Sequence, residues 1–131
     1  QAKSTLKALV ESTNENPIHL NNMAYVLDQL NEPNALDYAK RAHQVAPDNP
    51  YINDTVGWLL VKSGNAEEAL RYLRQAAARA GSLPEIRYHL GKALLELGRH
   101  DEARKELQSA IESGSRFNGY SDAKKILDTL S

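Results

Sequence analysis

The feature that most constrains this chain is an internal repeat, whose period is about 34 residues. The segment DTVGWLLVKSGNAEEALRYLRQA, which begins at Asp54, matches YHLGKALLELGRHDEARKELQSA, which begins at Tyr88. Small and apolar residues recur in register in the two segments, as Gly57 and Gly91, Leu60 and Leu94, Gly64 and Gly98, Ala69 and Ala103, Leu73 and Leu107, and Ala76 and Ala110. An earlier copy lies between Pro17 and Ala42 and is one residue shorter in its turn. Such a period predicts similar units that stack on their neighbours.

Each copy predicts two helices separated by a short turn. The first helix begins at a proline, which needs no N–H donor in a first turn, and ends at a residue that tolerates left-handed backbone. The starts are Pro17, Pro50 and Pro84, and the ends are Asn31, Gly64 and Gly98. In the middle copy Asn65 is predicted to cap the second helix, with Glu68 completing a capping box and Gly81 marking the end.

The small residues predict how the two helices of one copy touch. Gly57 on the first helix, with Ala69 and Ala76 on the second, leaves room for the two axes to approach closely. Larger side chains there would push the helices apart at a cost of about 1 to 3 kcal/mol.

The same register divides the chain into the parts of one domain. After the last full copy, Asn118 and Gly119 predict a turn, and Ser121 is predicted to cap a final amphipathic helix that closes the array. The predicted parts are the second helix of a truncated repeat at 1–16, full repeats at 17–49, 50–83 and 84–115, and a capping helix at 116–131.

These phased glycines, alanines and leucines resemble the tetratricopeptide (TPR) repeat, a helix-turn-helix unit of about 34 residues. The resemblance implies an all-α fold, a right-handed α-solenoid with a C-terminal capping helix, whose first helices line a concave groove. The strings LNNMAYVLDQL, APDNPYINDTVGWLLVKSG and PEIRYHLGKALLELGRHDEA look like the C-terminal repeats of bacterial TPR proteins, including envelope lipoproteins of exopolysaccharide and PEP-CTERM protein-sorting systems. That narrower likeness implies the periplasmic side of a membrane and a role in an export assembly.

Helical geometry indicates which residues face the groove. At 100° per residue, Val56, Gly57 and Leu60 share the side that packs on the second helix, and Trp58 lies roughly opposite. The positions predicted to bind a partner are Asn21, Asn22, Tyr25, Asp28, Asp54, Thr55, Trp58, Lys62, Tyr88, His89 and Lys92.

Two interpretations of the aromatic residues at these positions are open. Tyr25, Trp58 and Tyr88 either pack between neighbouring first helices or form a strip that anchors a peptide ligand. Some family members hold a terminal carboxylate with basic residues. In this chain Lys62 and Lys92 are the only basic residues among the groove positions, and they are opposed by Asp28, Asp54 and Glu96. An extended or helical segment with apolar anchors therefore fits better than a carboxylate clamp.

Composition and motifs argue against most other functions. The 16 basic and 17 acidic residues give no basic field for nucleic acid or an anionic membrane, and there is no cysteine. The four histidines have no metal-ligand spacing, and no nucleophile elbow, P-loop or dinucleotide motif is found. Charged residues of the second helices, such as Glu68 and Arg74, are predicted to form local ion pairs on a solvated face.

The sequence therefore predicts a non-enzymatic scaffold that binds a protein or peptide, with no catalytic residue, no cofactor and no metal. Nucleic acid and direct membrane insertion are not expected for this segment. The alternative is a structural spacer or self-association segment of a larger protein, so a homo-oligomer is possible. The compartment stays open, although the family resemblance favours the cell envelope.

Overall fold

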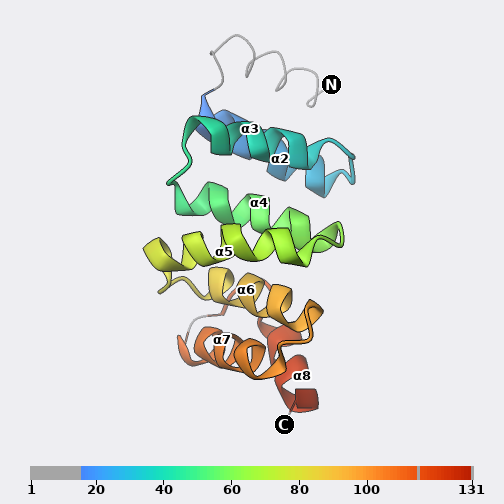
Figure 1. Ribbon diagram of the computed structural model, residues 1–131, viewed down its shortest axis with the longest axis vertical. Coiled ribbons are helices and arrows are strands. Elements are labelled where there is room, and N and C mark those ends of the chain that lie inside the picture. Colours follow the sequence, from blue (N-terminus) through green and yellow to red (C-terminus); the bar gives the residue numbers. More distant parts are fainter. Residues whose placement is uncertain (1–15, 115, 131) are drawn as a thin grey trace.

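The computed structural model describes residues 16–114 and 116–130. This part of the chain forms helices and no strands (Figure 1). The helices are α2 (Pro17–Gln29), α3 (Ala35–Val45), α4 (Pro50–Lys62), α5 (Ala66–Ala80), α6 (Pro84–Glu96), α7 (His100–Glu112) and α8 (Tyr120–Leu130). The helix predicted for residues 1–16 lies outside the described residues, except for Asn16.

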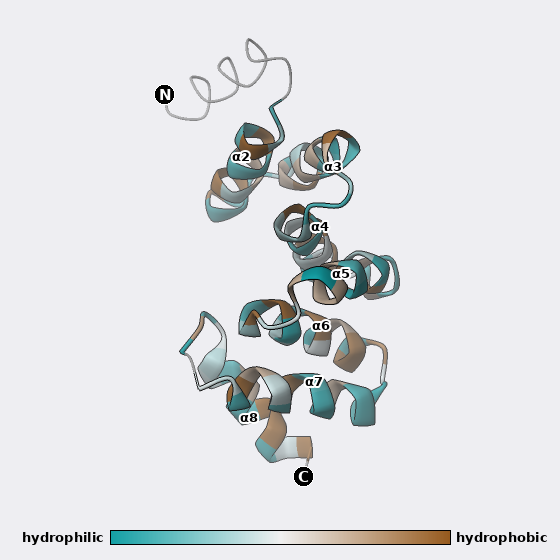
Figure 2. Ribbon diagram, turned by 90° about the vertical axis from the view of Figure 1, so that its left-hand side faces the viewer, coloured by the Kyte–Doolittle hydropathy of each residue, from teal (hydrophilic) through white to brown (hydrophobic). Residues whose placement is uncertain are grey.

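Consecutive helices pair into hairpins that follow one another along the long axis (Figures 1 and 2). The pairs are α2 with α3, α4 with α5, and α6 with α7, and α8 packs against α7. Direct contacts also join α2 to α4 and α4 to α6, so the first helices of successive hairpins form one continuous surface. The predicted all-α solenoid of helix-turn-helix units is thereby confirmed.

Prolines and asparagines together start the first helices. Helices α2 and α4 begin at Pro17 and Pro50, as predicted. The residue before each proline is an asparagine whose Oδ1 accepts backbone N–H groups of the first turn. For Asn16 the shortest such bond is 2.9 Å, from Ile18, and for Asn49 it is also 2.9 Å, from Tyr51. Because these bonds satisfy N–H groups that the helix leaves unpaired, the Asn-Pro pair fixes the start more firmly than proline alone.

The ends of the first helices use the left-handed residues that the sequence predicts. The φ angles are 58° at Asn31, 88° at Gly64 and 75° at Gly98. In all three turns the following N–H group reaches back to a carbonyl five residues earlier, as in Glu32 to Leu27, Asn65 to Leu60, and Arg99 to Leu94, at 2.8, 2.8 and 2.9 Å. The three turns therefore have the same geometry, so the two helices of each hairpin are joined in the same way.

The predicted end of α5 at Gly81 is confirmed, with right-handed backbone at that glycine (φ −67°). Two other local predictions were wrong in detail. The Asn65 side chain does not cap α5, and its Nδ2 donates instead to Ser63 Oγ at 3.2 Å. Helix α8 begins at Tyr120, so Ser121 belongs to its first turn rather than capping it.

In the second and third hairpins a glycine of the first helix faces a leucine of the second. A Cβ on Gly57 would lie 2.5 Å from Leu73 Cγ, and one on Gly91 would lie 2.8 Å from Leu107 Cγ. Both leucines are fully buried. The predicted close approach is present, although leucines rather than the alanines occupy the space opposite the glycines.

Candidate functional site

The row of first helices carries a cleft of about 340 Å³ between α2, α4 and α6. We call it the first-helix cleft. Its lining residues are Tyr25, Asp28, Gln29, Asp54, Thr55, Trp58, Leu59, Lys62, Glu85, His89 and Asn118. The structure thus brings together Tyr25, Asp28, Asp54, Thr55, Trp58, Lys62 and His89 from the positions predicted to bind a partner. Asn21, Asn22, Tyr88 and Lys92 do not line it.

An ion pair joins α2 to α4 at one side of this cleft. Lys62 Nζ donates to both carboxylate oxygens of Asp28, at 3.0 and 2.9 Å. Lys62 lies 34 residues after Asp28, on the first helix of the next repeat. This pair neutralises the one lysine among the cleft residues and fixes the spacing of the two helices.

A second polar pair joins α4 to α6 and supports Trp58. His89 Nδ1 lies 2.7 Å from Asp54 Oδ1, and since the carboxylate accepts, Nδ1 carries the proton. The Trp58 ring stacks on the His89 ring with centroids 4.1 Å apart and planes 20° apart. Trp58 is half-buried and packs against both core clusters of the described chain. Trp58 therefore packs against α6, the neighbouring first helix, and also lines the cleft.

The other two aromatic residues of the predicted strip have opposite environments. Tyr25 is 63% exposed, whereas Tyr88 is only 6% exposed. The segment before α8 covers Tyr88, whose hydroxyl donates to Asp122 at 2.6 Å and whose ring lies 5.8 Å from that of Phe117. The prediction that Tyr88 faces an open groove was wrong, because α8 and its connector occupy that end of α6.

Lys92 also binds Asp122, the residue that accepts from Tyr88. Its Nζ donates to Asp122 at 3.0 Å, so this lysine holds α8 in place instead of reaching the cleft. Asn21 is partly buried, and its Oδ1 has no hydrogen-bond donor among the described residues. Asn22 is exposed outside the cleft lining.

The predicted positions leave out four lining residues, Gln29, Leu59, Glu85 and Asn118. Glu85 occupies the position in its repeat that Tyr51 occupies in the preceding one, at the start of a first helix. Including the first turn of each helix in the predicted face would have found it. Leu59 is only 7% exposed, so only a small part of the residue reaches the cleft. Asn118 comes from the connector to α8, for which the repeat gives no signal.

The contact of Asp122 with α6 gives a pH dependence. Burial raises the pKa of Asp122, but the hydrogen bonds from Tyr88 and Lys92 and the charges of Lys92 and Lys125 outweigh it, so the pKa lies below its usual value of 3.8. Burial and the Asp122 contact raise the pKa of Tyr88 above its usual value of 10.0. The Asp122 carboxylate therefore stabilises the fold above about pH 4 and loses this effect as the pH falls through its lowered pKa. The neutral Tyr88 hydroxyl stabilises below about pH 10 and loses this effect at higher pH.

We expect an Asp122→Asn variant to be less stable than the wild type at pH 7 and closer to it at pH 2.5. Urea unfolding followed by circular dichroism at the two values measures the difference. A constant difference across this range would contradict the assignment, because a neutral asparagine cannot titrate.

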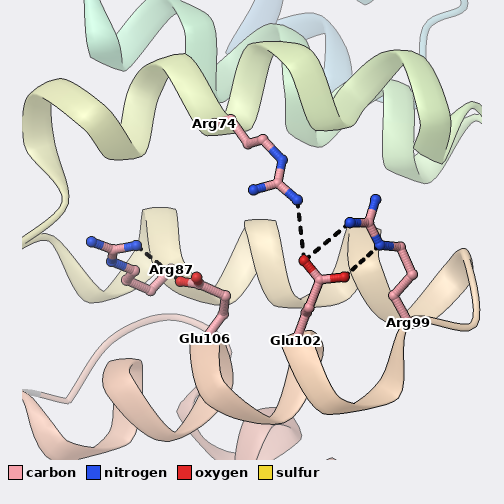
Figure 3. A network of polar contacts seen from close by, with 5 residues as sticks. All are labelled: Arg74, Arg87, Arg99, Glu102 and Glu106. Atoms are coloured by element: carbon pink, nitrogen blue, oxygen red, sulfur yellow. Dashed lines mark hydrogen bonds and ion pairs between the residues drawn. The ribbon is translucent and has the colours of Figure 1, made fainter.

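Ion pairs between hairpins join the second helices, and Figure 3 shows one of them, Arg74 with Glu102. Lys40 pairs with Glu68 and Arg74 with Glu102, each at 3.4 Å, and the second pair occupies the positions of the first in the next repeat. Figure 3 also shows Arg99 on Glu102, and its hydrogen bond lowers the pKa of that carboxyl. The predicted local pairs of Glu68 and Arg74 are instead pairs between repeats, so this face ties hairpins together.

Two further features are absent from the described residues. No helix among them is both long and apolar enough to cross a membrane. No group of three or more histidine, cysteine or acidic residues in this part of the chain could hold a metal ion.

Comparison with known proteins agrees with this geometry. A sequence model of the tetratricopeptide repeat matches residues 60–116. A TPR repeat-containing protein of Pseudomonas aeruginosa is 33% identical over 78 residues, which are 58% of this chain but only 13% of that protein's length. The crystal structure of MamA protein matches 98% of this chain and 69% of its own with a TM-score of 0.84 at 18% identity. The TPR domain of Sgt2 from Aspergillus fumigatus matches 87% of this chain and 76% of its own, with a TM-score of 0.76 at 24% identity.

Proposed function

We propose that this chain, which carries tetratricopeptide repeats, is a non-enzymatic scaffold that holds a segment of a protein partner in the first-helix cleft. Repeats of this type generally mediate protein–protein interaction. The observation that carries the proposal is the exposed Tyr25 ring beside the half-buried Trp58, both lining one cleft. Aromatic side chains of this kind dominate the energetics of protein interfaces.

Two polar pairs support the walls of the cleft. The Asp28–Lys62 pair and the Asp54–His89 pair each join two first helices across it. A partner therefore meets a surface whose side chains are already ordered, which reduces the entropy lost on binding.

Polar groups suited to a peptide backbone lie beside the aromatic rings. Gln29 and Asn118 are exposed, line the cleft and make no side-chain hydrogen bond within the described residues. Each amide offers a donor and an acceptor to an extended backbone. As part of the same proposal, the partner belongs to a bacterial envelope or export assembly, for which the sequence resemblance is the support.

Tyr25→Ala is expected to weaken peptide binding about thirtyfold, corresponding to about 2 kcal/mol at a hot spot. Dodecapeptides selected from a random display library against the folded chain are the probes, and fluorescence anisotropy measures their Kd. Val45→Ala is the control, because Val45 is also exposed, at 47%, but belongs to α3 outside the cleft. Selected peptides that bind the Tyr25 variant as tightly as the wild type would show that they dock elsewhere.

A second candidate function is self-association. Large apolar side chains are exposed at Ile18 and Leu30 as well as at Tyr25, all on α2 or its end. Sedimentation velocity at several concentrations separates the two functions, because self-association gives a mass that rises with concentration and a peptide-binding monomer does not.

A further inference from the structure

The charge of the first-helix cleft is unevenly distributed. Asp28 is bound by Lys62 through both of its oxygens, so this side is locally neutral. On the other side lie Asp54 and Glu85, with no lysine or arginine among the lining residues near them. Glu85 is exposed and forms no ion pair within the described residues. Negative charge that no lysine or arginine neutralises therefore remains between α4 and α6.

These two carboxylates belong to two adjoining hollows. Asp54 and Glu85 line the first-helix cleft and also a smaller hollow of about 160 Å³. The smaller hollow is completed by Tyr51, Leu83, Pro84 and Ile86. The carboxylates thus lie where apolar surface continues on both sides, with Trp58 in one hollow and the 60% exposed Tyr51 in the other.

The orientation of Asp54 is fixed by its neighbours. His89 Nδ1 holds one carboxylate oxygen at 2.7 Å, and His89 is itself held by stacking on Trp58. The Asp54 side chain is 19% exposed, so part of the group still reaches solvent. A cation entering the cleft therefore meets an acceptor that needs no rearrangement.

From this arrangement we infer that the cleft recognises a basic peptide segment, in which a lysine or arginine side chain binds Asp54 and Glu85 and flanking apolar or aromatic residues fill the two hollows. The inference rests on the proposed function and specifies its ligand. A guanidinium or ammonium group satisfies both carboxylates, and its aliphatic stem packs against the Trp58 ring. An acidic segment or a free C-terminal carboxylate is repelled at the same place.

Three pools of fluorescein-labelled, N-acetylated and C-amidated nonapeptides test the inference. The pools share leucine, tyrosine and glycine positions and differ only in a central pair of lysines, glutamines or glutamates. The lysine pool is expected to bind about fivefold more tightly than the glutamine pool, the upper range for an exposed ion pair. This preference should shrink as salt is raised from about 50 to about 500 mM, because exposed charges are screened.

The double variant Asp54→Asn with Glu85→Gln is expected to lose the preference for lysine, while asparagine keeps the acceptor for His89. Glu67→Gln with Glu112→Gln is the matched control, because both residues are exposed on second helices and the net charge changes equally. If the first variant unfolds on heating earlier than the control, Glu85→Gln alone is used.

The outcomes distinguish a failure of the basic-segment inference from a failure of the proposed peptide-binding function. Equal or tighter binding of the glutamine or glutamate pool, weakened by Tyr25→Ala, overturns the basic-segment inference and leaves the peptide-binding function standing. Binding that is insensitive to Tyr25→Ala, or no binding by any pool, counts against both.

Discussion

Replacing Gly57 by alanine is expected to lower the free energy of unfolding by about 2 kcal/mol, as is usual for an overpacked core. The new Cβ would lie 2.5 Å from Leu73 Cγ and 2.7 Å from its Cδ2, so one of the two helices must move. At an exposed helical position the same change stabilises by up to about 1 kcal/mol. The sign of the effect therefore reports the close approach of α4 and α5.

A double-mutant cycle makes this expectation specific to the contact. Leu73→Ala alone should cost about 2 to 5 kcal/mol, because it leaves a cavity in a fully buried position. Combined with Gly57→Ala, it should cost less than the sum of the two, because the added methyl enters the vacated space. Urea unfolding followed by circular dichroism and by Trp58 fluorescence measures all three variants.

The next repeat offers a matched comparison. Gly91 and Leu107 have the same geometry, with a Cβ-to-leucine distance of 2.8 Å. The cycle on this pair should therefore give a coupling of the same sign. Additive effects in both cycles, or a stabilised Gly57→Ala, would contradict a tightly packed glycine–leucine contact.

The parts of the fold that sequence could predict are those encoded within one repeat. The left-handed residues Asn31 and Gly64 end their helices through local backbone geometry, and Gly57 marks the packed face through helical spacing. Such features recur at each period, so every copy tests the interpretation of the others. Asn65 is the counterexample, because its side chain donates to the neighbouring Ser63 instead of capping the helix that follows.

Repeat spacing also predicted most of the residues that line the cleft, except near the connector before α8, which lies outside the repeat. Tyr25 on α2 and Trp58 on α4 line it because these two helices lie side by side in the row of first helices. Tyr88 occupies in its repeat the position of Asp54, which also lines the cleft, but it is buried by the connector that precedes α8. That connector departs from the repeat, so nothing in the earlier copies indicates where it lies.

Gly119 is the residue on which the covering of Tyr88 depends. Its φ is 105°, and a Cβ would lie 2.3 Å from Tyr88 Cε2. Gly119→Ala combines a cost of about 1 to 2 kcal/mol for left-handed backbone with about 1 to 3 kcal/mol for overpacking. Because α8 is the terminal helix of the described chain, we expect the loss to appear as local release of α8 rather than as unfolding of all hairpins.

Hydrogen exchange of the amides of α8 measures this release. A local loss of about 3 kcal/mol corresponds to exchange roughly a hundredfold faster in α8, with α4 and α5 little changed. Gly114→Ala is the control, because Gly114 has φ 79° but no atom within 4 Å of an added Cβ, so it carries the backbone strain without the clash. Equally faster exchange of the α8 amides in both variants would mean that the Tyr88 ring moves aside at little cost. Other contacts would then hold the connector. A selective effect at Gly119 would show that one close contact between a glycine and a tyrosine ring ends the groove at the third hairpin.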